Sequence, residues 1–191
     1  MSAKGRLSPT KLPLVLFHGL GMTAESAWQE VVPLLSEHHE IFTPTALGHP
    51  GRPPSWRRPV LIRDVVNAAE WHLEQCGLER PHLAGNSLGG YVAIELARRG
   101  RASTVCALSP AGFWMAGDGL QSQLLRKFKT TLRMARLTQS VSPLMLKSAT
   151  LRRLTLRDTA CHGDRLTLDR ALKMSDDFLA SPADDVGRDA G

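Results

Sequence analysis

Two kinds of segment alternate along residues 12–110. Continuous apolar runs at 14–17, 41–43, 82–84 and 104–108 are typical of strands that are buried on both faces of a sheet. Between them, apolar residues recur every three or four positions at 23–35, 61–76 and 88–99, which predicts helices, with Pro33 as an irregularity in the first. The alternation predicts an α/β fold, with a mainly parallel sheet of about four strands flanked by helices.

The pattern changes after Gly112. Apolar residues from Leu120 to Ala135 again recur every three or four positions, and residues 144–174 continue this spacing with breaks near 142–143 and 161–163. Residues 181–191 are mostly small or charged and are expected to be disordered. We therefore divide the chain into a core at 1–112, a helical region at 113–180 and a disordered tail at 181–191.

One stretch carries candidate chemistry. Gly85, Ser87 and Gly89 form a G-x-S-x-G pattern between an apolar run and a helical segment. This pattern is typical of a serine on a tight strand-to-helix turn, where a Cβ on either glycine would collide with backbone. Ser87 would then be strained, with its hydroxyl exposed above the sheet. The alternative is an ordinary loop rich in glycine and serine.

Composition narrows the classes of partner. The 191 residues fit one domain, and 42% hydrophobic with 22% charged residues is typical of a soluble globular protein. The net charge of +6 comes without any nucleic-acid-binding signature, so no nucleic-acid partner is expected. Cys76, Cys106 and Cys161 are scattered, which favours a cytoplasmic location. The apolar run at 12–17 is too short for stable membrane insertion, and no spacing suggests a metal or a cofactor.

These motifs together resemble the α/β-hydrolase superfamily. The resemblance rests on His18-Gly19 after the first apolar run, on a loop with Gly48 and Gly51, and on the stretch 85–90. The helices of 113–180 look like the lid of that family.

The resemblance implies a set of site residues. Ser87 would be the nucleophile, and the backbone N–H groups of Leu20 and Leu88 would form an oxyanion hole, because fixed amides stabilise developing charge without reorganising. The motif glycines of such a site would be Gly19, Gly85 and Gly89.

The family also supplies an Asp or Glu and then a His from loops after later strands. Only about ten residues follow the lid here, whereas a strand plus a helix needs roughly thirty, so the C-terminal strands and both triad partners are expected to be missing. His162 with Asp158 is a weak substitute pair, because residues four apart share a helix face. An ordinary surface pair is the alternative.

Three further side chains are candidates for the pocket. His18 is expected to shape the oxyanion loop, and His49 either lines the pocket or is a solvated loop residue. Trp114 belongs to an apolar group that forms an acyl pocket, or simply core. The basic face of the lid either attracts membranes or acidic substrates, or is only solvated.

Two functions remain open. The first is an esterase-like serine hydrolase that acts on a small-molecule carbonyl substrate; a dehalogenase is disfavoured because those relatives carry Asp in place of Ser87. The second is a catalytically incomplete fragment or pseudoenzyme that acts at most as a binding module. In either case the run 104–108 would be a sheet edge, and self-association through that edge is expected.

Overall fold

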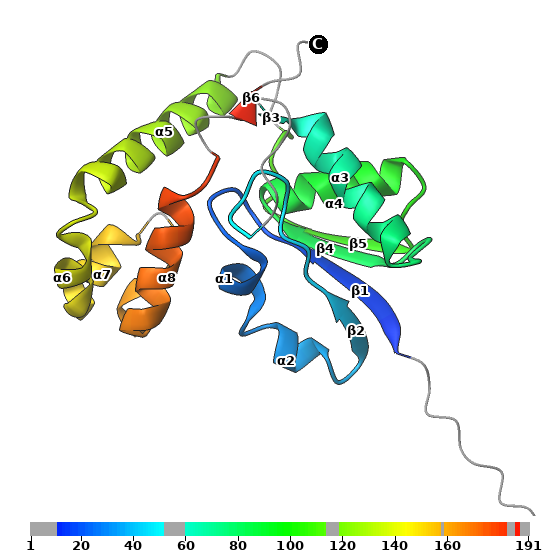
Figure 1. The fold of residues 1–191 in the computed structure, drawn as a ribbon, viewed down its shortest axis with the longest axis horizontal. Coiled ribbons are helices and arrows are strands. Elements are labelled where there is room, and N and C mark those ends of the chain that lie inside the picture. Colours follow the sequence, from blue (N-terminus) through cyan, green and yellow to red (C-terminus); the bar gives the residue numbers. More distant parts are fainter. Residues whose placement is uncertain (1–10, 52–59, 114–118, 158, 183–185, 188–191) are drawn as a thin grey trace, which may run out of the picture.

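A parallel four-stranded sheet forms the centre of the computed structural model, which describes residues 11–51, 60–113, 119–157, 159–182 and 186–187. Its strands, in the order β2-β1-β4-β5, are β1 (Leu12–Phe17), β2 (His39–Phe42), β4 (His82–Asn86) and β5 (Thr104–Leu108). All three pairings are parallel (Figure 1). The predicted α/β fold with about four strands is confirmed.

Helices cover both faces of this sheet, and β1 shows why. Its residues Val15 and Phe17 pack into a core with α3 (Ile62–Gln75) and α4 (Leu88–Arg98). The alternate residues Leu14 and Leu16 pack on the opposite face with Trp28 of α1 (Ala24–Trp28) and with α2 (Val32–Leu35). Successive strand residues point to opposite faces, so a continuous apolar run supplies both cores.

One predicted helix is divided. The segment 23–35 forms α1 and α2 as separate short helices, with Pro33 in the first turn of α2. Proline is accepted there because the first N–H groups of a helix have no intrahelical partner. The prediction of one irregular helix was therefore wrong in its continuity.

The region that the resemblance predicts to be a lid forms a helical layer beside the core, and we keep the name lid for it. It consists of α5 (Leu120–Thr138), α6 (Ser142–Lys147), α7 (Ala149–Thr155), the 3-10 turn η1 (Gly163–Arg165) and α8 (Leu168–Leu179). The lid has a small hydrophobic core of its own, formed by Leu146, Leu156 and Ala171. α8 contacts α1, and α5 and α6 pack on α8, so α8 is the lid helix nearest to the sheet domain (Figure 1).

A buried polar contact fastens α8 to α1. Asp177 is 4% exposed and accepts hydrogen bonds from the Thr23 hydroxyl at 2.7 Å and from Lys173 Nζ at 3.1 Å. Thr23 also caps α1 reciprocally with Ser26. Arg170 donates to the Ser26 carbonyl. We call Thr23, Ser26, Arg170, Lys173 and Asp177 the latch.

Two short strands lie outside the sheet. β3 (Val60–Leu61) pairs in parallel with β6 (Val186–Gly187), and neither was predicted. Ser181 and Pro182 are buried. Residues 181, 182, 186 and 187 are thus ordered, unlike the disordered tail that was expected at 181–191. The other residues of that segment lie outside the described part of the chain. Within that part, β5 has no strand on its outer side.

Candidate active site

Ser87 occupies a sharp turn between β4 and α4. Its backbone has φ 52° and ψ −114°, a combination that costs a non-glycine residue about 1–3 kcal/mol. Three hydrogen bonds hold it there. Its N–H donates to the Leu108 carbonyl at 2.9 Å, and its own carbonyl accepts from Tyr91 N at 3.1 Å and Ala111 N at 3.0 Å. The end of β5 and the start of α4 therefore impose the turn.

The flanking glycines are required by contact with backbone. A Cβ at Gly85 would overlap the Gly89 carbonyl and lie 2.7 Å from Gly90 N. A Cβ at Gly89 would overlap the Phe17 carbonyl and lie 2.7 Å from the His18 carbonyl oxygen. Only hydrogen fits at either position, as the sequence argument expected.

The loop of residues 18–21, which we call the oxyanion loop after the role predicted for it, lies beside this turn. A Cβ at Gly19 would meet Asn86 Oδ1 at 3.1 Å and the Ser87 Cβ at 3.4 Å, so the glycine lets the two segments approach. Leu20 follows directly. Leu88 is the first residue of α4, where N–H groups have no intrahelical partner and carry the positive end of the helix dipole. Leu20 and Leu88 thus belong to the two segments that meet beside Ser87. The oxyanion hole expected from their N–H groups stays a prediction.

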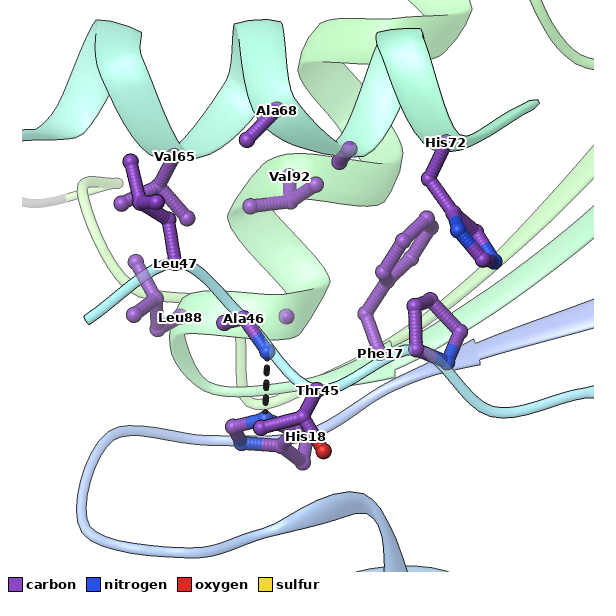
Figure 2. A pocket seen from close by; sticks show the side chains of 13 residues that line it. Phe17, His18, Thr45, Ala46, Leu47, Val65, Ala68, His72, Leu88 and Val92 are labelled. Atoms are coloured by element: carbon purple, nitrogen blue, oxygen red, sulfur yellow. Dashed lines mark hydrogen bonds between the residues drawn. The ribbon is translucent and has the colours of Figure 1, made fainter. Parts of the chain in front are cut away.

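His18 holds the oxyanion loop through both ring nitrogens. Its Nε2 accepts from Ala46 N–H at 2.9 Å, so Nδ1 carries the proton, and Nδ1 lies 2.9 Å from the Gly19 carbonyl that it donates to (Figure 2). The side chain is 1% exposed, and burial lowers its pKa. His18 is therefore neutral at pH 7, and both its ring nitrogens are already hydrogen-bonded to the backbone rather than to Ser87.

His49 packs edge-on against His18, with ring centroids 4.8 Å apart. It is 3% exposed, so it is not a solvated loop residue. Burial, and then the proximity of His18, lowers the pKa of His49 to about 4. Its Nε2 is buried without a hydrogen-bond partner among the described residues. Both imidazoles are thus neutral at pH 7 and support the loop.

The small cavity in Figure 2 lies behind the serine turn, between α3, α4 and residues 44–47. Its volume is about 20 Å³, enough for about one water molecule, and its lining is mostly apolar. A larger open hollow of about 580 Å³ lies between α1, α2, residues 43–51 and Lys173. Ser87 lines neither of them.

The remaining candidates lie elsewhere. Trp114 and Asp158 are outside the described residues. His162 is exposed at the turn before η1, and no described side chain hydrogen-bonds the Ser87 hydroxyl. Among the described residues there is also no cluster of three His, Cys, Asp or Glu side chains that could hold a metal ion.

Two lid side chains near the site were missed by sequence reasoning. Phe128 of α5 and Phe178 of α8 have ring centroids 5.2 Å apart, and both meet Gly21 of the oxyanion loop. A Cβ at Gly21 would lie 2.8 Å from Phe178 and 3.2 Å from Phe128. No local signal predicts this contact, because Gly21 is more than a hundred residues away in the chain from either phenylalanine.

Comparisons with known proteins agree with this fold. A family model described as "Alpha/beta hydrolase family" matches residues 14–189. Epoxide hydrolase EphH of Mycobacterium tuberculosis is 46% identical over 64 residues, which are 34% of this chain and 30% of the relative. A 2-hydroxymuconate semialdehyde hydrolase of Pseudomonas is 33% identical over 93 residues, or 46% and 31% of the two chains. The alignments thus span about a third of these curated relatives.

Solved structures show the same architecture. The epoxide hydrolase CorEH superposes with a TM-score of 0.67 at 18% identity, over 92% of this chain and 65% of that one. Naproxen esterase from Bacillus subtilis superposes with a TM-score of 0.61, also at 18% identity, over 88% and 54% of the two chains. At such identities the likeness shows the fold alone.

Proposed function

This chain belongs to the alpha/beta hydrolase family, and from that premise we propose that it is an esterase-like serine hydrolase with Ser87 as nucleophile. The observation that carries the proposal is the backbone of Ser87, which is strained and held by three hydrogen bonds beside the oxyanion loop. Strain of this kind persists only where the surrounding structure imposes it, and it gathers at reactive sites.

The proposed reaction is acyl transfer to a small ester-like substrate. Ser87 Oγ bonds to the carbonyl carbon while its proton passes to a base, and the carbonyl oxygen becomes an oxyanion. The amides of Leu20 and Leu88 stabilise that charge without reorganising. The alcohol then leaves with a proton, and water cleaves the acyl-enzyme to the acid and free Ser87.

The chemistry of serine favours a carbonyl substrate over an epoxide or a haloalkane. Attack of a hydroxyl on either of those carbons would leave a stable ether on the enzyme. A carboxylate nucleophile would instead leave an ester that water can cleave. Epoxide hydrolysis, the activity for which EphH is named, therefore does not suit Ser87, whereas ester hydrolysis, as in the name of naproxen esterase, agrees with the proposal.

A second candidate is a catalytically incomplete chain that binds a small molecule without turning it over. One observation favours it: among the described residues no imidazole reaches the Ser87 hydroxyl, and both nitrogens of His18 are already hydrogen-bonded. A serine hydroxyl without a base is a poor nucleophile at neutral pH.

Hydrolysis of p-nitrophenyl acetate separates the two candidates. The serine hydrolase predicts turnover that Ser87→Ala reduces to the background rate. Ser109→Ala is the matched control, because Ser109 also has a positive φ, of 45°, and follows the neighbouring strand β5. If the folded wild-type protein hydrolyses the ester no faster than Ser87→Ala, the serine hydrolase is excluded and the catalytically incomplete binding protein is supported.

We further propose that the protein is located in the cytoplasm. Cys76, Cys106 and Cys161 are all free thiols, and the last two are exposed. Exposed free thiols favour a reducing compartment. The substrate class is a small molecule, and we propose no nucleic-acid partner.

A further inference from the structure

The lid segment 119–157 has an unusual charge pattern. Between Asp118 and Asp158 the sequence contains no acidic residue at all. The same segment contains nine basic residues, which are Arg126, Lys127, Lys129, Arg133, Arg136, Lys147, Arg152, Arg153 and Arg157. Since the whole chain carries 24 basic and 18 acidic side chains, this imbalance is local and gives the lid a strongly positive field.

Helix geometry gathers four of these charges on one side of α5. Arg126, Lys129, Arg133 and Arg136 follow one another at intervals of three, four and three residues, so they lie along one stripe. All four are exposed, whereas Leu132 is buried. The stripe is therefore open to solvent, and buried Leu132, three residues after Lys129 and four before Arg136, lies at its edge.

Large aliphatic side chains are exposed among these charges. Leu137 of α5 is 72% exposed and follows Arg133 by one helical turn. The neighbouring helices add Leu144 at 71% and Leu154 at 57%. Further members of the set are Met134, Val141 and Leu151. Because α8 lies between α1 and the other lid helices (Figure 1), these residues lie on the lid helices beyond it.

A surface that combines basic and aliphatic side chains fits one class of partner. We propose that the outer lid face, meaning the exposed residues of α5 to α7, docks on an anionic lipid bilayer. Its Lys and Arg side chains contact the headgroups, and its Leu, Met and Val side chains enter the boundary with the acyl chains. No described helix is long and apolar enough to cross a membrane, so docking is superficial.

Other partners fit this face less well. Nucleic acid would pair with the charges but would leave the exposed leucines without apolar contacts. A second copy of the same face would bring its positive charges against those of the first without an acidic residue between them, and like charges at an interface are strongly unfavourable.

Vesicle sedimentation of the full chain tests the proposal. We expect binding to phosphatidylcholine vesicles with about one third phosphatidylglycerol, at least about tenfold tighter than to phosphatidylcholine alone, and weakened by salt. Arg126→Gln with Arg133→Gln should weaken binding about 25-fold, or about fivefold for each charge. Leu137→Ser should weaken it about fivefold.

The core offers matched controls. Arg63→Gln with Arg98→Gln removes two exposed charges from α3 and α4, and Leu34→Ser removes a leucine that is also 72% exposed. We expect both to bind within about twofold of wild type, since all these positions lie outside the lid. Far-UV circular dichroism establishes that every variant is folded.

Several outcomes would overturn the proposal. These are no binding to anionic vesicles at low salt, equal binding to neutral vesicles, and lid variants that bind as well as the core controls. Retention on duplex DNA that Leu137→Ser leaves unchanged, without vesicle binding, would assign the charges to nucleic acid. Dimers that Leu137→Ser dissociates, again without vesicle binding, would assign the face to a second copy.

Discussion

Replacing Gly89 by alanine tests the geometry of the serine turn, because helix propensity and steric overlap predict changes in stability of opposite sign. Gly89 is the second residue of α4 and has no positive φ, so its backbone suits any residue. Helix propensity alone would make alanine up to about 1 kcal/mol more stable there. The new Cβ would, however, overlap the Phe17 carbonyl and lie 2.7 Å from that of His18.

Steric overlap should outweigh propensity. Overpacking a filled site costs about 1–3 kcal/mol, and the upper value applies here because Phe17 lies in β1, which is paired with β2 and β4 on its two sides. Subtracting about 1 kcal/mol of propensity leaves a net loss of about 2 kcal/mol. For a chain of this length that loss lowers Tm by roughly 4–8 °C.

Differential scanning calorimetry measures the change, and two variants calibrate it. Gly90→Ala lies one residue further along α4, where the nearest atoms are 3.1 Å away, and should cost less. Gly100→Ala has φ 77° and open space around its Cβ, so it should lose only about 1 kcal/mol from the backbone. A Gly89→Ala protein that melts at or above the wild-type temperature would refute the close contact between α4 and β1.

The latch, the buried histidines and the sheet edge give three further predictions. Burial alone would raise the pKa of Asp177, but hydrogen bonds from Thr23, Ser26 and Lys173 outweigh it, and the pKa is lowered. The stability that ionised Asp177 contributes is therefore present above about pH 4 and is lost as the pH falls further. Asp177→Asn should lower the free energy of unfolding by about 2 kcal/mol at pH 7, measured by urea denaturation, and should reduce the loss of stability at acid pH. An unchanged urea midpoint would contradict this role of Asp177. His49, with its pKa lowered to about 4, makes the protein lose up to roughly 3 kcal/mol as pH falls from 6.5 to 4, since the unfolded state takes up the proton first. His49→Phe should reduce this slope, and an equally steep decline would show that His49 is not buried. Cys106 is exposed on the edge strand β5, so Cys106→Lys should suppress concentration-dependent association in sedimentation velocity, with Cys106→Ser as the control for disulfides. A wild-type protein that stays monomeric at high concentration would remove the case for edge pairing.

The sheet was predictable because its signals are local. Each apolar run is short and continuous, as is typical of a strand that is covered on both faces. Gly85 and Gly89 could be recognised because the G-x-S-x-G pattern itself is local. The resemblance to a known family then indicated which serine to examine.

Other features depend on residues far apart in the sequence. In the sequence, nothing distinguishes Asp177 from other acidic residues of a helix. Its role depends on α8 packing against Thr23, which lies 154 positions earlier. Phe128 and Phe178 both contact Gly21, and no spacing in the sequence predicts that contact. His49 was ambiguous between pocket and solvent, because its burial follows from the packing of residues 44–51 on His18.

The most direct test of the central claim is covalent labelling of the folded protein by a fluorophosphonate, read by mass spectrometry of its peptides. We expect one phosphonyl group per chain, located on Ser87, absent from Ser87→Ala and retained in Ser109→Ala. A folded chain without label, or with label on another residue, would contradict the claim that Ser87 is the nucleophile.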